Sequence, residues 1–213
     1  IALTAVLLLF LETTSRTAAL VYFFRDYLGR EDLVPLANVL RATVVIGLAT
    51  CVRLALRIGK RNTLVSGVAL GLAGVVLPIP FGTAPNPVLI GIAIGAVGTG
   101  MVLGLIFSMA ADVIDYSARR SGVHAGGLIA ATVGLAAKVG VALGGAGVAW
   151  ILAAGGYEGG TGVQGEGAVI AIRFAFYGLP AVLLVTVLAL MPLYRVDRHL
   201  AAGVPQASGS APP

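Results

Sequence analysis

Residues 88–111 have the sequence VLIGIAIGAVGTGMVLGLIFSMAA, a continuous apolar stretch that contains no charged side chain. A helix of about 20 mainly apolar residues spans the roughly 30 Å hydrocarbon core of a bilayer. This stretch has that length, and it lacks the alternation of polar and apolar residues that marks a membrane β-strand. It therefore predicts a transmembrane helix.

Five further stretches meet the same requirement, so the chain is predicted to be an all-α membrane protein with six transmembrane helices. The predicted spans cover about residues 1–24, 34–56, 63–81, 88–111, 128–154 and 168–193. They form one bundle within residues 1–200, and residues 201–213 are predicted to be a disordered cytoplasmic tail. Close helix packing is indicated by glycines spaced four apart at Gly67/Gly71, Gly91/Gly95, Gly100/Gly104 and Gly140/Gly144.

The composition excludes an ordinary soluble domain. Apolar residues make up 58% of the chain and charged residues 11%, whereas a soluble domain carries about 25% charged residues. The net charge of +5 does not indicate a nucleic-acid partner, because the basic residues are scattered between apolar runs. The single Cys51 supplies neither a disulfide nor a thiolate metal site. We expect no metal, no cofactor and no enzymatic activity, and a lipid bilayer as the surroundings.

The lysines and arginines of the loops predict the orientation. One side has Arg25, Arg30 and Arg173. The other side has a larger set: Arg53, Arg57, Lys60, Arg61, Arg119, Arg120, Arg195 and Arg198. Because positive loops stay inside, both termini are expected in the cytoplasm of a multi-pass protein of the cell (inner) membrane.

Four ionisable residues stand out at membrane depth in the predicted spans, namely Glu12, Arg16, Arg41 and Lys138. Such a residue costs at least about 2.5–3.5 kcal/mol at a helix centre and usually marks a pathway or a pair. Glu12 and Arg16 are four apart, so they either form a structural pair or line a cavity. Arg41 and Lys138 have no partner in their own spans, although Arg41 can also snorkel to an interface. The net embedded charge of +2 needs an anionic substrate or acidic residues elsewhere, so we predict that these four residues line a substrate and cation pathway.

Six motifs follow one another along the second half of the predicted bundle and the loop before it: RIGKR at 57–61, ADVIDY at 111–116, RRSG at 119–122, KVG at 138–140, GGA at 144–146 and WIL at 150–152. This ordered series resembles the glycoside–pentoside–hexuronide:cation symporter family of the major facilitator superfamily. The resemblance implies that the six spans correspond to helices seven to twelve, the C-terminal bundle of that fold. It also implies a partner, the N-terminal six-helix bundle of the same polypeptide, and the chain starts inside an apolar run as a fragment would.

The resemblance assigns roles to individual residues. Lys138 matches an intramembrane lysine near the cation and sugar region. A cytoplasmic gate is implied for Asp112, Asp115, Tyr116, Arg119, Arg120, Arg57, Lys60 and Arg61. The chain departs from the family pattern at residues 124–126, which are His-Ala-Gly, and at Ala137.

The expected function is Na⁺- or H⁺-coupled symport of a sugar or glycoside by alternating access. The coupling-ion site is expected mostly in the N-terminal bundle. Two alternatives stay open: a carrier for a lysophospholipid or another amphiphile, and an uncoupled or export-type facilitator. A channel is disfavoured because the sequence has neither a filter motif nor a ring-forming acidic motif.

Overall fold

The computed structural model describes residues 2–121, 126–159 and 164–191, and these residues form helices and connecting turns without a β-strand. Six of the helical segments are long and apolar enough to cross a membrane: Leu3–Tyr27, Glu31–Ile58, Lys60–Phe81, Pro85–Ile106, Gly126–Ala154 and Glu166–Leu190. The predicted fold class and the six predicted spans are therefore confirmed. The predicted tail at 201–213 lies outside the described residues.

Three spans are interrupted helices. The first is α1 (Ala2–Tyr22) continued by a π-turn η1 (Phe23–Tyr27). The second consists of η2 (Glu31–Leu33), α2 (Val34–Leu40), the 3₁₀ turn η3 (Arg41–Thr43) and α3 (Val44–Ile58). The last consists of α7 (Glu166–Arg173), a π-turn η5 (Phe174–Gly178) and α8 (Leu179–Leu190). Short 3₁₀ and π segments inside helices often occur at functional positions.

The remaining spans are α4 (Lys60–Val76) with the short turn η4 (Ile79–Phe81), α5 (Pro85–Ser121) and α6 (Gly126–Ala154). Helix α5 continues for ten residues beyond residue 111, where the predicted span ends. Between Gly104 and Gly122 the chain has no glycine or proline, so nothing in the local sequence ends the helix sooner. The segment predicted as a cytoplasmic loop is thus mostly a helical extension.

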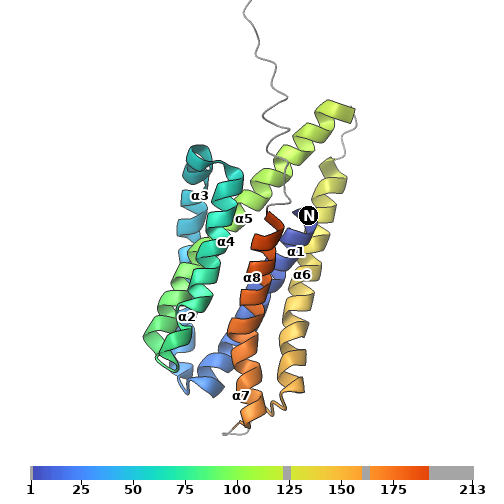
Figure 1. Ribbon diagram of the computed structural model, residues 1–213. Coiled ribbons are helices and arrows are strands. Elements are labelled where there is room, and N and C mark those ends of the chain that lie inside the picture. Colours follow the sequence, from blue (N-terminus) through green and yellow to red (C-terminus); the bar gives the residue numbers. More distant parts are fainter. Residues whose placement is uncertain (1, 122–125, 160–163, 192–213) are drawn as a thin grey trace, which may run out of the picture.

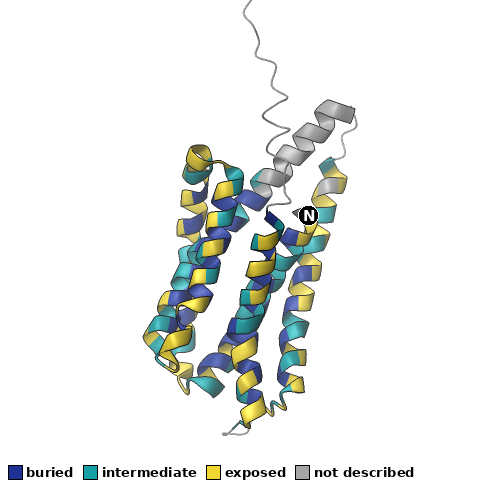
Figure 2. Cartoon of the chain, viewed as in Figure 1, coloured by how far each residue is buried: buried dark blue, intermediate teal, exposed yellow. Residues whose placement is uncertain are grey.

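The bundle has two groups of helices (Figure 1). Figure 1 shows α3, α4 and α5 together on one side and α1, α6 and α8 on the other. Helix α5 packs extensively on α3 and α4, and α1 packs on α6 and α8. Large apolar side chains on the outer faces are exposed, such as Leu56, Leu128 and Trp150, as a lipid-facing surface requires (Figure 2).

Glycine allows the closest helix contacts, as the spacing predicts. A Cβ atom added to Gly140 or Gly144 of α6 would lie 2.5 Å from the Leu7 carbonyl oxygen or 2.6 Å from that of Leu11, both on α1. A Cβ on Gly91 of α5 would lie 2.5 Å from the carbonyl oxygen of Gly74 on α4. Such distances would force the helices apart, so these positions require glycine.

Candidate functional site: a charged cavity within the bundle

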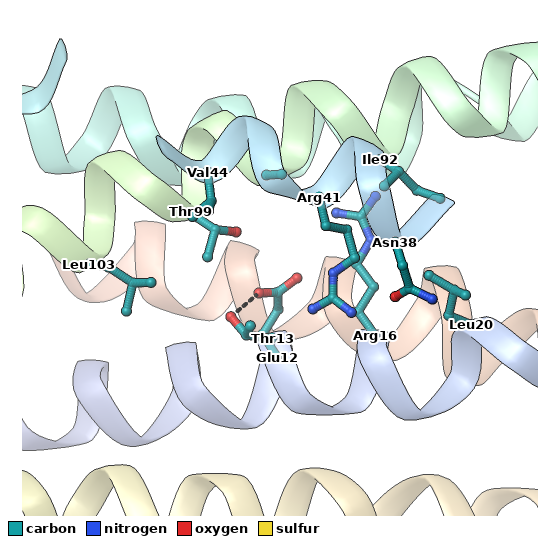
Figure 3. A pocket seen from close by; sticks show the side chains of 11 residues that line it. Glu12, Thr13, Arg16, Leu20, Asn38, Arg41, Val44, Ile92, Thr99 and Leu103 are labelled. Atoms are coloured by element: carbon teal, nitrogen blue, oxygen red, sulfur yellow. Dashed lines mark hydrogen bonds between the residues drawn. The ribbon is translucent and has the colours of Figure 1, made fainter. Parts of the chain in front are cut away.

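A cavity of about 330 Å³ lies between α1, the interrupted second span and α5 (Figure 3). Small-molecule sites occupy about 300–1,000 Å³, so this one suits a small ligand. It is lined by Glu12, Thr13, Arg16, Leu20, Asn38, Arg41, Val44, Ile92, Ala96, Thr99 and Leu103. The lining residues come from the middle of the spans, where a polar cavity is costly unless a ligand uses it.

The structure brings together three of the four predicted pathway residues. Figure 3 shows the side chains of Glu12, Arg16 and Arg41 directed into the same space from opposite walls. Lys138 does not line this cavity and is exposed on α6. The embedded charges therefore divide into a clustered set and one residue on the outer face of the bundle.

Arg16 crosses the bundle to α4 and α5. Its guanidinium donates hydrogen bonds to the carbonyl oxygens of Gly74, at 3.2 Å, and Gly91, at 3.3 Å. Gly95 leaves the space for this guanidinium, because a Cβ atom there would collide with Arg16 Nη1. The Arg16 Cζ atom also lies 6.0 Å from the centroid of the Phe176 ring, within reach of a cation–π interaction. Arg16 is thus held firmly by main-chain oxygens.

Glu12 is buried, with 5% of its surface exposed. The Thr13 hydroxyl donates a hydrogen bond to its carboxylate at 3.2 Å. Among the described residues the ion pairs are Arg25–Asp26 and Arg30–Asp32, so the direct Glu12–Arg16 pair favoured by their spacing does not form.

Arg41 occupies the 3₁₀ break of the second span. Its guanidinium donates a hydrogen bond to the hydroxyl of Thr17 on α1. Next to it, the Thr43 hydroxyl donates to the carbonyl oxygens of Leu40 and, at 2.9 Å, of Ala93 on α5. The break therefore places a cation in the cavity and links α1, the second span and α5.

Three neutral polar residues of the cavity are absent from the predicted site: Thr13, Asn38 and Thr99. Asn38 lies three residues before Arg41, so the two share a helix face, and this spacing could have identified it. Thr99 is the one polar residue between 88 and 107 in an apolar span, which is a weaker signal. These residues add hydroxyl and amide groups that can bind sugar hydroxyls.

The predicted cytoplasmic gate is described only in part. Arg57 is exposed in the last turn of α3, and Lys60 and Arg61 begin α4. Arg61 donates a hydrogen bond to the Met191 carbonyl oxygen at 3.4 Å. The other predicted gate residues lie on the helical extension of α5, and their side chains lie outside the described part: Asp112, Asp115, Tyr116, Arg119 and Arg120. The gate therefore remains a prediction.

A polar cluster joins α1 to α6 at the opposite end of the bundle. Arg25 pairs with Asp26 at 3.0 Å and donates to the Tyr157 hydroxyl at 2.6 Å. Tyr157 in turn donates to Asp26 at 2.9 Å. Burial, with the hydrogen bond to the Asp26 carboxylate, raises the pKa of Tyr157. The cluster stabilises the end of the helix pair, and the sequence did not predict it.

Six apolar spans, three of which line a charged cavity, define a multi-pass membrane protein. Residues 1–198 match the model of the family described as MFS/sugar transport protein. The chain therefore belongs to the major facilitator sugar transporters, within the glycoside–pentoside–hexuronide:cation symporter family predicted from the motifs. Its members are carriers, so the expectation that the chain is not an enzyme is confirmed.

Three relatives illustrate this membership. The chain is 33% identical over 187 residues to the isoprimeverose transporter of Lactiplantibacillus pentosus, which covers 86% of this chain and 39% of the relative. It is 38% identical over 88 residues to the "Putative glycoside/cation symporter YagG" of Escherichia coli (strain K12), covering 41% and 19%. It is 34% identical over 102 residues to a glucuronide carrier protein homolog of the same organism, covering 47% and 22%. The chain thus spans about two-fifths or less of the length of these relatives.

Proposed function

We propose that this bundle is part of a secondary transporter that moves a sugar or glycoside together with Na⁺ or H⁺ by alternating access. The observation that carries the proposal is the cavity inside the bundle, with Glu12, Arg16 and Arg41 on its walls. Buried charge is costly in a membrane and serves a purpose only where it meets a ligand, an ion or a partner group. The names of the relatives supply the substrate class, a sugar or glycoside.

Alternating access requires a second body that moves against this one. In the major facilitator fold, two six-helix halves rock about a site near the bilayer midplane. We propose that a second bundle packs against this bundle and contributes most of the coupling-ion site. Within the described residues no group of three or more His, Cys, Asp or Glu side chains could hold a metal ion.

Lys138 is proposed to act at the contact with that second bundle. Its side chain is exposed on α6, and the α6 face that packs on α1 is the one with Gly140 and Gly144. Successive helix residues are rotated by about 100°, so Lys138 lies roughly opposite to Gly140 on the helix. A lysine there can sense acidic groups of the second bundle, and binding of a cation to those groups would change its interactions. This is the proposed route of coupling.

The test is uptake into proteoliposomes by the full product of the gene, with methyl β-glucoside and methyl β-glucuronide as labelled substrates. Saturable uptake that rises with an inward Na⁺ or H⁺ gradient, and that shows counterflow, supports the proposal. Uptake that ignores both gradients would indicate an uncoupled facilitator. Transport of lysophospholipid, with neither sugar taken up, would show that the substrate is not a sugar.

A matched pair of substitutions tests whether the cavity is the site of transport. Leu103→Trp fills the cavity, whereas Leu128→Trp makes the same change at a side chain that is 72% exposed on α6. Blocking the cavity should lower uptake at least about tenfold, which corresponds to about 1.4 kcal/mol. The Leu128 variant should transport like the wild type, provided that both variants elute as folded monodisperse protein. Equal uptake by the two variants would place the substrate elsewhere.

A further inference from the structure

A smaller cavity, of about 70 Å³, lies beside the charged cavity, between α1, α4, α5 and α8; we call it the side pocket. The two cavities share the lining residues Glu12, Thr13, Thr99 and Leu103. The rest of the side pocket is lined by apolar residues and glycines, namely Leu9, Phe10, Gly67, Val68, Gly71, Gly98, Val102 and Leu184. The side pocket thus brings two helices that do not line the charged cavity, α4 and α8, next to the proposed sugar site.

The side pocket suits hydrocarbon better than water. A buried water needs two to four polar partners, whereas an apolar cavity stays dry and takes up apolar ligands. The hydroxyl groups at its boundary already donate hydrogen bonds, Thr13 to the Glu12 carboxylate and Thr99 to the Gly95 carbonyl oxygen. An apolar cavity of about 150 Å³ can hold benzene, so a space of about 70 Å³ holds about three carbon atoms.

Gly71 leaves part of the side pocket open, although helix packing does not require glycine there. A Cβ atom on Gly98 would lie 2.5 Å from the carbonyl oxygen of Gly67, so the contact of α5 with α4 requires that glycine. A Cβ atom on Gly71 would instead have Leu184 Cδ1 as its nearest neighbour, at 3.6 Å, which is an ordinary van der Waals distance. Alanine would fit at this position and would favour the helix more than glycine does. Packing of the helices therefore does not explain the open space at Gly71.

We propose that the side pocket is a subsite for a hydrocarbon group of about three carbon atoms that is attached to the sugar in the charged cavity, with Gly71 and Leu184 setting its size limit. This inference rests on the proposed function, because it adds a subsite to the same cavity. The sugar hydroxyls bind the polar groups of the charged cavity, while the attached apolar group fills the side pocket. That group is either an alkyl aglycone or a methyl group of a deoxy sugar ring, and both present hydrocarbon next to a polar ring.

The experiment measures equilibrium binding to the purified full gene product by calorimetry. The probes are methyl, n-propyl and n-hexyl β-glucoside, together with methyl 6-deoxy-β-glucoside, in which a methyl group replaces CH₂OH. Burial of each methylene group should raise the affinity roughly fourfold. The n-propyl glucoside should therefore bind about 15-fold more tightly than the methyl glucoside. The n-hexyl glucoside should gain nothing further, because its chain is longer than the side pocket.

Two substitutions change the size of the side pocket in opposite directions. Gly71→Ala places a methyl group in it and should lower the n-propyl preference about fourfold, the contribution of one methylene group. Gly147→Ala, with nothing within 4 Å of its Cβ position on α6, is the matched control and should keep the full preference. Leu184→Ala removes one wall and should let the n-hexyl glucoside bind more tightly than the n-propyl glucoside. This last comparison requires that the variant elutes as folded monodisperse protein, and Gly71→Ala decides the question without it.

The outcomes separate this inference from the proposed function. Binding of methyl β-glucoside without a gain for any apolar group overturns the subsite and leaves the sugar cavity in place. An n-propyl gain that is unchanged in Gly71→Ala places the hydrocarbon elsewhere and also overturns the subsite. A gain that Gly71→Ala reduces supports the subsite, and it assigns the pocket to the aglycone if the n-propyl glucoside shows it or to the sugar ring if the 6-deoxy glucoside does. Absence of binding by all four glucosides contradicts the proposed function, and the subsite with it.

Discussion

Helices α1 and α6 pack closely side by side, and each carries basic charge at membrane depth, yet they place it differently. On α1, Glu12 and Arg16 face the cavity, and Arg16 reaches main-chain oxygens of two other helices. On α6, Lys138 is exposed on the side away from α1. The α1 charges thus lie inside the bundle, whereas Lys138 lies on its surface.

From this difference we infer that charged residues at membrane depth have two roles in the molecule. The α1 charges stabilise the bundle and shape a ligand cavity at the same time. Lys138 is exposed on α6, and we propose that its role lies in transport. Substitution of the α1 charges should therefore lower the stability of the bundle. Substitution of Lys138 should lower only the coupling of uptake to an ion gradient.

The largest expected effect is that of Arg16→Met. The substitution leaves Glu12 buried without its neighbouring charge and two carbonyl oxygens without their donor. Breaking a buried charge arrangement costs about 3–5 kcal/mol, and we expect a loss of that size in the free energy of unfolding in detergent. Arg30→Met, at an exposed pair, should cost less than about 1 kcal/mol. Similar losses in the two variants would show that Arg16 is not structural.

A smaller effect is expected from Gly95→Ala, which tests the space reserved for Arg16. Alanine normally stabilises a helix by about 0.5–1 kcal/mol relative to glycine. At Gly95 the new methyl group meets Arg16 Nη1, so we expect destabilisation by about 1–3 kcal/mol in the same unfolding assay. Gly147→Ala, with nothing within 4 Å of its Cβ position, is the matched control and should be neutral or stabilising.

The Gly95 effect should depend on Arg16. In the Arg16→Met background the methyl group no longer meets a guanidinium, so the cost of Gly95→Ala should fall by about 0.5–3 kcal/mol, the range found for residues in contact. A cost that stays the same in both backgrounds would mean that Gly95 serves helix packing and not the position of Arg16.

The smallest effect on stability is expected from Lys138→Ala, which should stay within about 0.5 kcal/mol of the wild type. Its effect on transport should nevertheless be large, because the proposed route of coupling passes through this charge. We expect loss of the dependence of uptake on a Na⁺ or H⁺ gradient in proteoliposomes. Unchanged coupled transport in this variant would remove Lys138 from the mechanism and reduce α6 to a lipid-facing helix.

The spans, their type and their number could be predicted because each apolar stretch has the length that a bilayer demands. The helix breaks could not. Arg41–Thr43 interrupts the second span without a glycine or proline, and its stability depends on contacts such as that of Thr43 with Ala93 on α5. The extension of α5 to Ser121 could not be predicted from the apolar pattern, because the charged residues after 111 end the apolar stretch but not the helix.

The charged residues of the cavity could be predicted, but its neutral polar residues and its geometry could not. The cost of buried charge identified Glu12, Arg16 and Arg41, and all three line one cavity. Spacing along α1 favoured a Glu12–Arg16 pair, yet Arg16 bonds Gly74 and Gly91, which are 58 and 75 residues away in the chain. Those oxygens are available only because the fold places α4 and α5 within reach of the Arg16 side chain, and local spacing in a single sequence does not encode this arrangement.

The most direct test of the proposed function is whether a sugar enters the cavity between α1, the second span and α5. Thr99→Cys places a thiol on the cavity wall in a Cys51→Ala background, and Leu135→Cys places one on the exposed face of α6. We predict that methyl β-glucuronide or methyl β-glucoside slows modification of the Thr99 thiol by a methanethiosulfonate reagent and leaves the Leu135 thiol unaffected. Modification of the Thr99 thiol at the same rate with and without either sugar would contradict the assignment of this cavity as the transport site.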